Sequence, residues 1–302
     1  MIARALLTLL LVLTPASALA AACPAPLRVM SYNVRLDTPA DGDNRWDRRR
    51  PLLVSQLDLL QPAILGLQEV LPGQLRDLEA ALPGHVRIGE GRDGAGQGEA
   101  APLFIDRRQF KVRASGTFWL SLTPQVPSLG WDAAYRRIAS WARVQRRADG
   151  ARLLAINTHW DHVGVQARLE SARQLAAWIA TNRAAGERVV LLGDFNAALD
   201  EASLRHLLGP LRDARQAAGA RAAGTTITFN GFDPLPRAGE TIDHILASPD
   251  LPVVRYHALA EQFDGRVASD HFPVIADLAL RAGSASRMTG RTGKEALPAC
   301  QF

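Results

Sequence analysis

Five short polar signatures in this chain combine side chains that bind divalent cations with side chains that transfer protons. They are Ser31-Tyr32-Asn33, Gln68-Glu69, Asn157-Thr158-His159-Trp160-Asp161-His162, Gly193-Asp194-Phe195-Asn196, and the pair Ile242-Asp243-His244 with Ser269-Asp270-His271. Carboxylate and amide oxygens are the ligands of hard cations, and a histidine beside a carboxylate accepts or donates a proton. An isolated Asp-His pair is more often a surface turn than a site, so the prediction of a site rests on all five signatures together.

The segments that precede these signatures indicate how the fold would position them. Four short apolar runs each end where a polar signature begins: Leu27–Met30, Ala63–Leu67, Leu153–Ile156 and Val189–Leu192. Buried strands that carry functional groups at their carboxyl ends have this pattern. We therefore expect six side chains to converge around one cation-sized hollow: Asn33, Glu69, His159, Asp194, Asp243 and His271.

Helices are predicted between the strands. Residues 164–183 place Val165, Leu169, Ala172, Ala176 and Ile179 on one face of an amphipathic helix, and residues 47–60 and 72–82 are predicted as further helices. Other strand-like runs have no helix between them: Phe110–Leu120, Ile138–Gln145, Val253–Leu259 and Phe272–Leu280. This order predicts mixed sheets with helices outside.

Together, the signatures resemble those of the endonuclease/exonuclease/phosphatase superfamily, which includes pancreatic-type deoxyribonucleases, deadenylases and inositol polyphosphate 5-phosphatases. The resemblance runs from about Leu27 to Leu280. It is closest to an exported bacterial branch with five further motifs: Asp41-Gly42-Asp43-Asn44, Gly91-Arg92-Asp93, Gly116-Thr117-Phe118-Trp119-Leu120-Ser121, Gly130-Trp131-Asp132-Ala133-Ala134 and Phe229-Asn230-Gly231-Phe232. It implies a deoxyribonuclease I-like α/β fold, a four-layer α/β/β/α sandwich with two packed mixed sheets.

The resemblance implies a Mg²⁺ or Mn²⁺ site built on Glu69. Glu69 takes the position of the principal metal ligand, Asn33 lies beside it, and Asp270 is expected to give further support. Some nucleases of the superfamily carry an acidic residue two places after the motif asparagine, where this chain has Arg35. The chain therefore departs from a two-metal arrangement that uses that position.

The resemblance also implies catalytic roles for five residues. His271 matches a histidine that acts as a base or as an electrostatic partner of the phosphate, and Asp243 would fix its tautomer. Asp194 would orient or deprotonate the attacking water. Asn196 and His159 would donate hydrogen bonds to phosphate oxygens in the transition state.

Residues outside these signatures are candidates for substrate contact. Arg137 and Asn230 are predicted substrate contacts because loops between strands often determine specificity. The sequence Gly89–Gly94 matches G-x-G-x-x-G, but no helix follows it, so we expect a flexible surface loop there. Asp161 and His162 are interpreted as turn residues in preference to a supporting role. Four tryptophans could stack on a base or sugar, although core packing is favoured: Trp119, Trp131, Trp141 and Trp160.

Residues 1–22 have the features of a secretory signal peptide. Arg4 provides the positive charge, Leu6–Leu13 is a short apolar run, and Ala18-Leu19-Ala20 is a cleavage motif. The run is too short to span a bilayer. We therefore expect an exported protein, periplasmic or secreted.

The two cysteines, Cys23 and Cys300, could pair in an oxidising compartment and so link the two ends of the chain. Lipid modification of Cys23 is the less favoured alternative, because the usual leucine three residues earlier is Ala20. The sequence shows no internal repeat and no second apolar span, so residues 23–281 are predicted to form one catalytic domain. Residues 282–302, rich in Gly, Ser and Thr, are predicted to be a flexible tail.

Composition excludes several classes of protein. The 302 residues are 47% hydrophobic and 22% charged, which excludes disordered, collagen-like and polytopic membrane chains. The net charge is +5, but Arg4 and the tail supply three of these charges, so residues 23–281 carry only +2. A nucleic-acid binder usually concentrates basic residues on one face. No such cluster is visible beyond Arg48–Arg50 and the pairs Arg107–Arg108, Arg136–Arg137 and Arg146–Arg147.

These observations predict a metal-dependent hydrolase of phosphate esters, whose partner is its substrate, a nucleic acid or a small phosphorylated molecule. A nuclease-type phosphodiesterase ranks first on family frequency alone. The alternative is a phosphatase or phosphodiesterase for a sugar phosphate, an inositol phosphate or a phospholipid headgroup, which the modest charge favours. A catalytically silent binding module is a third hypothesis. No obligate protein partner is evident.

Overall fold

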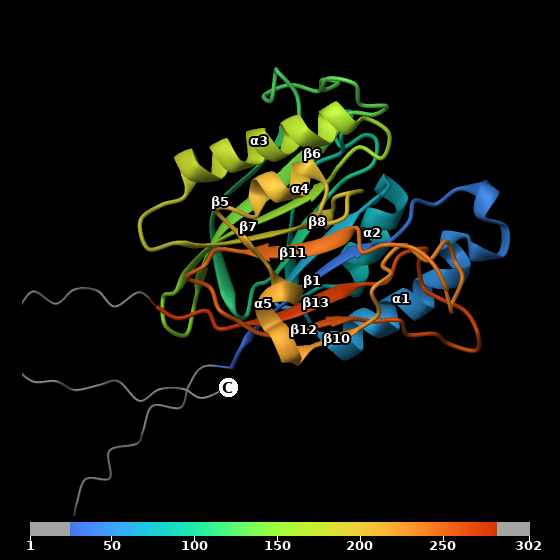
Figure 1. Cartoon of the computed structure of the whole chain (residues 1–302). Coiled ribbons are helices and arrows are strands. Elements are labelled where there is room, and N and C mark those ends of the chain that lie inside the picture. Colours follow the sequence, from blue (N-terminus) through green and yellow to red (C-terminus); the bar gives the residue numbers. More distant parts are fainter. Residues whose placement is uncertain (1–24, 283–302) are drawn as a thin grey trace, which may run out of the picture.

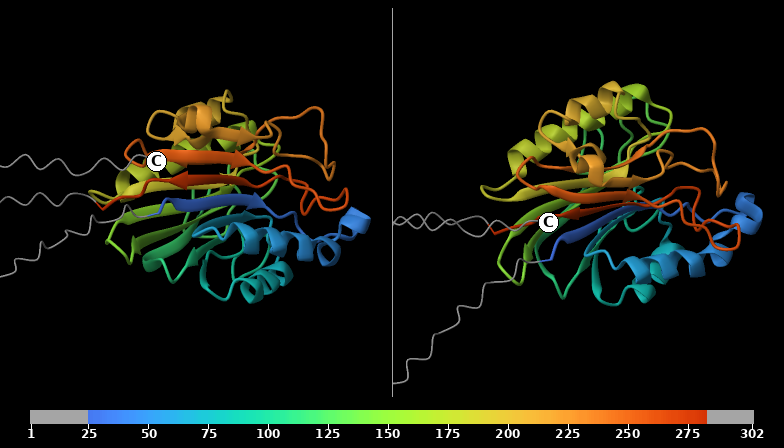
Figure 2. Two further views of the ribbon diagram at one scale, coloured as in Figure 1. Left: turned by 90° about the horizontal axis from the view of Figure 1, so that it is seen from below. Right: turned by 60° about the horizontal axis from the view of Figure 1, so that its bottom comes forward.

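The computed structural model describes residues 25–282. The predicted signal peptide, both cysteines and all of the predicted tail except its first residue lie outside the described residues. Within 25–282, two mixed β-sheets pack face to face, with helices on both outer sides (Figures 1 and 2). The predicted four-layer α/β/β/α sandwich is confirmed.

The first sheet contains the amino-terminal strand at its centre. Its order is β10 (Ala222–Gly224), β12 (Val253–Ala258), β13 (Val274–Leu278), β1 (Leu27–Asn33), β2 (Ile64–Gln68), β4 (Leu103–Asp106) and β3 (His85–Ile88). Strands β1 and β2 are parallel, and β13 runs antiparallel to β1 on its other side.

The second sheet holds the other two strands that end in polar signatures. Its order is β5 (Phe110–Trp119), β6 (Ile138–Arg146), β7 (Arg152–His159), β8 (Arg188–Asp194), β11 (Asp243–Ala247) and β9 (Arg212–Asp213). Strands β7 and β8 are parallel, whereas β11 runs antiparallel to β8. Each sheet therefore has a parallel central pair whose carboxyl ends point the same way.

Helices cover the outer face of each sheet (Figure 2). The longer ones follow the predictions closely: α1 (Trp46–Leu60), α2 (Pro72–Ala81) and α3 (Val165–Asn182). The shorter ones are α4 (Ala202–Leu207), α5 (Ala214–Ala218) and the 3₁₀ helices Pro39–Asn44 and Gly219–Arg221. Helices α1 and α2 pack on the first sheet, and α3 and α4 on the second.

Alternating side chains explain the layers. On β8, Val190 and Leu192 face the core between the two sheets, while Val189 and Leu191 face α3. Successive residues of a strand point to opposite faces, so a continuous apolar strand can be buried on both. This double burial fixes the strand and presents Asp194 at its end.

The buried face of α3 is shifted from the predicted one. The prediction places Val165 on that face, but the side chain is 62% exposed, whereas Arg168 is buried. Arg168 donates to the backbone oxygen of Asp161 and pairs with Glu201 at 2.9 Å. The spacing of apolar residues could not predict this face, because a charged residue such as Arg168 can also be buried when it has these partners.

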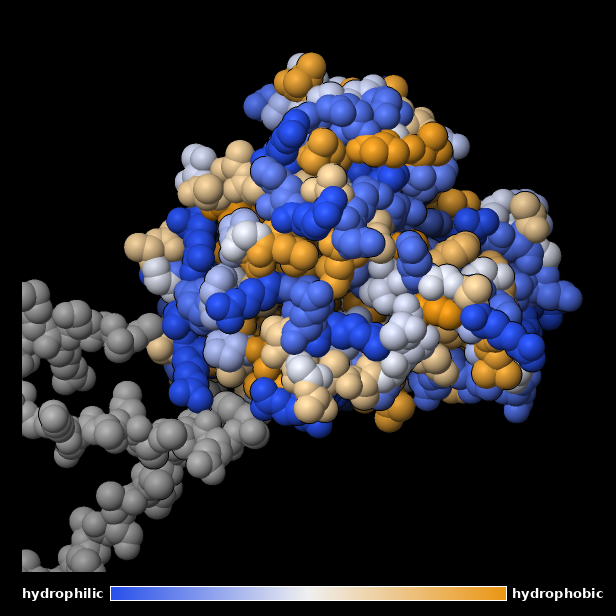
Figure 3. Space-filling view, in the orientation of Figure 1, coloured by the Kyte–Doolittle hydropathy of each residue, from blue (hydrophilic) through white to orange (hydrophobic). Residues whose placement is uncertain are grey.

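The surface is a mixture of hydrophilic and hydrophobic side chains without one continuous hydrophobic area on the face shown in Figure 3. Large exposed apolar residues such as Leu59 and Leu122 are spread over different elements. Among the described residues, no helix is both long and apolar enough to cross a membrane.

Candidate active site

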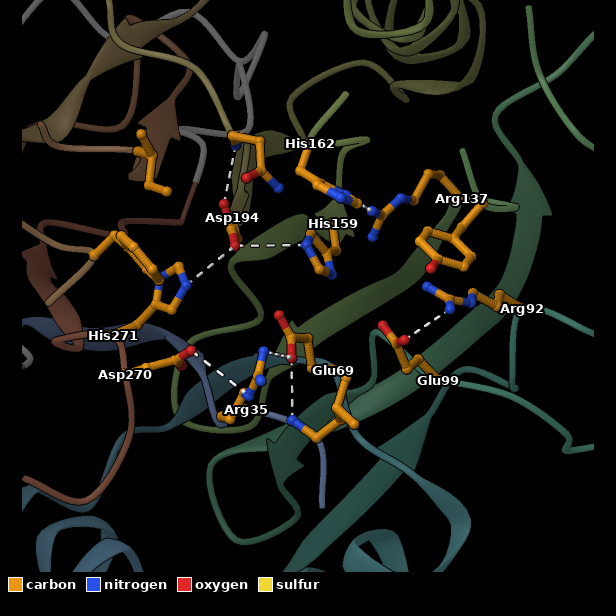
Figure 4. A pocket seen from close by; sticks show the side chains of 15 residues that line it. Arg35, Glu69, Arg92, Glu99, Arg137, His159, His162, Asp194, Asp270 and His271 are labelled. Carbon is orange, nitrogen blue, oxygen red and sulfur yellow. Dashed lines mark hydrogen bonds and ion pairs between the residues drawn. The ribbon is translucent and has the colours of Figure 1, made fainter. Parts of the chain in front are cut away.

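The strand registers bring the polar signatures to one end of the sandwich. Asn33 is opposite Gln68 in the first sheet, while Asp194 lies between His159 and Asp243 in the second. These side chains meet at a pocket of about 430 Å³ (Figure 4). All six residues expected to converge are therefore found together, four lining the pocket and two, Asn33 and Asp243, directly behind it.

The centre of the pocket is a compact group of metal-ligand atoms. Glu69, Asp194 and His271 each offer one atom, and these atoms lie within 4.8 Å of one another. The side-chain nitrogen of Asn33 donates to Glu69 at 3.0 Å and to Asp194 at 2.9 Å, while its oxygen accepts from the backbone nitrogen of Arg35. Asn33 thus joins the two carboxylates.

His271 is oriented by a carboxylate. Its Nδ1 lies 2.8 Å from Asp243, which leaves Nε2 facing Asp194 at 3.7 Å. Burial alone would lower the pKa of His271, but the carboxylates of Asp243 and Asp194 outweigh it and hold this pKa well above its ordinary value. The predicted Asp243–His271 pair is therefore present as a contact.

Asp194 and His159 form a second carboxylate–histidine pair, in which the two pKa values shift in opposite directions. Burial, together with repulsion from Asp243, raises the pKa of Asp194 to about 7. His159 Nε2 lies 3.5 Å from Asp194, and burial, reinforced by the positive charge of Arg137, holds the pKa of His159 well below its ordinary value. Burial thus favours the neutral form of both groups, and titratable groups with strongly shifted pKa values cluster at acid–base sites.

Three site residues adopt a left-handed backbone just after a strand. The φ angle is 55° at Arg35, 62° at Glu69 and 46° at Asn196. This conformation is uncommon outside glycine and costs on the order of 1–3 kcal/mol per residue. All three residues line the pocket, so the strained backbone occurs where the chain places functional side chains.

Arg35 occupies the position where some relatives carry an acid. Its guanidinium bonds to Asp41 at 2.9 Å and lies 3.7 Å from Asp270 and 4.0 Å from Glu69. A fixed positive charge therefore stands beside Glu69, consistent with the departure from a two-metal arrangement noted in the sequence.

Two predicted residues are placed differently from expectation. Asp270 lines the pocket but pairs with Arg35, so it lies outside the three-residue group that includes Asp194. Asn230 does not line the pocket, because its side chain bonds to the backbone of Ser269 and Phe232. Asn230 instead holds the loop that carries Asp270 and His271, and its role as a substrate contact stays a prediction.

Asn196 also uses its amide within the protein. Its side-chain nitrogen donates to the backbone oxygen of Trp160 at 3.0 Å, and its backbone nitrogen donates to Asp194 Oδ1 at 2.9 Å. The residue lines the pocket and fixes the rotamer of Asp194.

The pocket wall away from His271 contains residues that the sequence pattern did not identify. They are Arg92, Glu99, Tyr135 and His162, beside the predicted Arg137. Arg137 pairs with Asp161 at 3.3 Å and contacts His162. Asp161 also accepts from the backbone nitrogens of Val163 and Gly164, so it forms the predicted turn and positions Arg137 as well.

The glycine-rich segment forms a tight turn at the surface, with no helix after it, as predicted. The backbone nitrogen of Asp93 donates to the backbone oxygen of Gln97, and a Cβ added at Gly91 would lie 2.0 Å from that same oxygen. This tight approach requires glycine. It directs Arg92 inward, where its side chain is only 13% exposed.

Other polar residues of the signatures are structural. Asn157 is buried between the sheets, where it accepts from the Gln68 side chain at 2.7 Å and donates to the backbone oxygens of Leu67 and Pro102. The four tryptophans do not line the pocket, and Trp160 packs on Phe195 in the core beneath α3.

Comparison with known proteins identifies the family. The model of the Endonuclease/Exonuclease/phosphatase family matches residues 30–271, and the chain belongs to this family. It is therefore a hydrolase of phosphate esters, in a family that uses divalent metals. No match is found among curated proteins.

Solved structures share this fold. A mannosyl-6-phosphatase of Bacteroides thetaiotaomicron VPI-5482 is 35% identical, with a TM-score of 0.79 over 83% of this chain and 99% of that chain. An endonuclease/exonuclease/phosphatase from Bacteroides vulgatus is 36% identical, with a TM-score of 0.80 over 85% of this chain and 100% of that chain. The human Nocturnin catalytic domain with bound sulfate is 21% identical and shares the fold, with a TM-score of 0.67 over 85% of this chain and 94% of that chain.

Proposed function

We propose that this protein is an exported phosphatase that removes phosphate from small phosphorylated sugars with the help of Mg²⁺ or Mn²⁺. The observation that carries the proposal is the pocket of about 430 Å³, a volume within the range of small-molecule sites. The similarity to a mannosyl-6-phosphatase, over 99% of that chain, supports a phosphorylated sugar as substrate.

The charges around the pocket favour this substrate over a nucleic acid. All three arginines that line the pocket are paired with carboxylates: Arg35 with Asp41, Arg92 with Glu99, and Arg137 with Asp161. A nucleic-acid strand is bound by basic side chains that neutralise successive phosphates. Paired arginines are poorly suited to that task, so the nuclease-type phosphodiesterase, first on family frequency, has less support.

The donor atoms of the pocket fit a hard divalent cation. Glu69 would hold it, with Asp194 and His271 offering further ligand atoms within the same 4.8 Å group and Asn33 and Asp270 beside them. Burial raises the pKa values of Asp194 and Asp270, and a bound cation would favour the charged form of both carboxylates. A bound cation would neutralise the charge that develops on the phosphate oxygens.

The side chains of this chain supply the remaining functions. Asp194, with a pKa of about 7, is suited to take a proton from the attacking water, and Asn196 fixes its orientation. His271, held at Nδ1 by Asp243, presents Nε2 to the phosphate. His159, neutral because its pKa is low, donates a hydrogen bond, and Arg35 attracts the phosphate.

A substrate panel tests this proposal. With Mg²⁺ or Mn²⁺, the purified protein should release inorganic phosphate from hexose 6-phosphates, mannose 6-phosphate among them, and should leave DNA and RNA oligonucleotides intact. Chelation should stop the reaction, and the added metal should restore it. Cleavage of oligonucleotides without phosphate release from any sugar phosphate would contradict the proposal in favour of a nuclease.

Export is supported by the signal-peptide features of residues 1–22. Mass spectrometry of the protein recovered from its native cells should give a chain that begins near Cys23. An additional lipid mass on Cys23 would indicate the lipoprotein alternative, and an intact Met1 in the cytoplasm would contradict export.

A further inference from the structure

We infer that the pocket wall formed by Arg92, Glu99, Tyr135, Arg137 and His162 binds neighbouring hydroxyl groups of the substrate's sugar ring. The inference rests on the proposed function and names the part of the pocket that selects the substrate. Figure 4 shows Arg92, Glu99, Arg137 and His162 across the pocket from His271, with the Glu99 carboxylate turned toward the same space as Glu69.

Arg92 and Glu99 form a fixed donor–acceptor pair. Arg92 Nη2 lies 2.7 Å from Glu99 Oε1, and both side chains are 13% exposed. The backbone nitrogen of Arg92 also donates to the backbone oxygen of Glu99, so the tight turn at Gly91 aligns the two residues. The second carboxylate oxygen of Glu99 accepts no hydrogen bond from a described residue, and it is available to a ligand.

Charge divides the pocket into two ends. Glu99 would repel a phosphate dianion, and its own pKa is raised by burial and by the nearby charge of Glu69. With a divalent cation held at Glu69, the phosphate would be drawn to the end that also carries Arg35 and His271. The neutral, hydroxyl-rich part of a sugar phosphate would then lie against Glu99 and Arg92.

The chemistry of this pair matches hydroxyl groups. A carboxylate only accepts hydrogen bonds and a guanidinium only donates them, whereas a hydroxyl does both. Two adjacent ring hydroxyls can therefore bridge Glu99 and Arg92. Sites built to bond a substrate hydroxyl reject analogues that lack it, because their buried polar groups are then left unpaired.

Tyr135 adds an aromatic surface beside the pair. Arg92 lies over its ring at 4.7 Å, and His162 stacks on it with ring centroids 6.0 Å apart. The Tyr135 side chain nevertheless remains half exposed. Its ring is thus held in place by its neighbours, and the exposed part of the side chain offers apolar surface beside Arg92.

The test compares two substrates in the Glu99→Gln variant. We measure kcat/KM for a hexose 6-phosphate and for p-nitrophenyl phosphate, which has no ring hydroxyls. The ratio of the two values should fall on the order of 10–100-fold, mainly through KM for the sugar phosphate, as expected for loss of a hydrogen bond to a charged group. Glu79→Gln, at an exposed pair with Arg87, is the matched control and should leave the ratio unchanged.

Inhibition by free hexose is a second measurement, which reports on the subsite even if a variant folds poorly or the enzyme hydrolyses no sugar phosphate. Free hexose should competitively inhibit hydrolysis of p-nitrophenyl phosphate by the wild type, and the inhibition should weaken in Glu99→Gln and in Tyr135→Ala, whose side chain is half exposed. Equal losses on both substrates, with unchanged inhibition by hexose, would overturn the hydroxyl subsite. A wild type that hydrolyses aryl phosphate but no sugar phosphate would overturn the proposed function, and hexose inhibition would still decide the subsite.

Discussion

Replacing His271 by alanine is expected to lower turnover of a phosphate ester by on the order of 10²-fold or more. The imidazole is the group that Asp243 holds at 2.8 Å and directs toward Asp194, and two carboxylates keep its pKa high. Its loss removes both a proton-transferring group and a positive charge beside the phosphate. Steady-state kinetics should show the effect in kcat, because the interaction is strongest in the transition state.

Two further variants separate catalysis from folding. His206→Ala removes an exposed histidine from α4 and should leave kcat unchanged. Asp243→Asn should reduce kcat, and combining it with His271→Ala should add little, because residues that act as a unit are not additive. Full turnover in a folded His271→Ala protein would remove this histidine from the mechanism.

Replacing Glu69 by glutamine is expected to have the largest effect, a loss of roughly 10³-fold in kcat/KM. Bound metal contributes several kcal/mol to stabilising charge in the transition state, and each 1.36 kcal/mol corresponds to a tenfold change in rate. Glutamine keeps the size of Glu69 and removes its charge, but its single amide oxygen replaces the two carboxylate oxygens that accept separately from Asn33 and Leu36. Activity should be measured across a Mn²⁺ titration, in which the variant should need far more metal.

Glu79→Gln again provides a matched control, since Glu79 is an exposed residue in an ion pair on the surface. Its metal requirement and rate should equal those of the wild type. If Glu69→Gln kept both the rate and the metal requirement of the wild type, the cation would have to be held elsewhere.

The sequence predicted those parts of the site that follow buried strands. Glu69 and Asp194 each come directly after an apolar run, and parallel pairing then places such strand ends side by side. The three longest helices were also predicted, to within two residues at either end. Strands β3 and β4 were not predicted, because each has only four residues, too few to show a regular alternation of apolar and polar side chains.

The far wall of the pocket could not be read from the sequence for a different reason. Arg92, Glu99 and Tyr135 lie on loops, where no period relates one position to another. Their convergence depends on the tight turn at Gly91 and on ion pairs that form only after the sheets have packed. The one available signal was Gly91-Arg92-Asp93, a motif shared with the exported branch that the predicted chemistry did not use.

Asn230 shows what the sequence does not reveal about a polar residue. Its position on a loop between strands suggested substrate contact, and in the structure its amide donates to the backbone of Ser269 and accepts from that of Phe232. Sequence identifies a polar side chain but not the backbone groups that will satisfy it, and buried polar groups are usually satisfied within the protein.

The most direct test is anomalous X-ray diffraction from crystals of the protein grown with Mn²⁺ and phosphate. We expect one manganese peak in contact with the Glu69 carboxylate, and phosphate bound between it and His271. The peak should be absent from Glu69→Gln crystals prepared in the same way. Manganese bound away from Glu69, or phosphate bound outside this pocket, would contradict a single metal-assisted site at the strand ends.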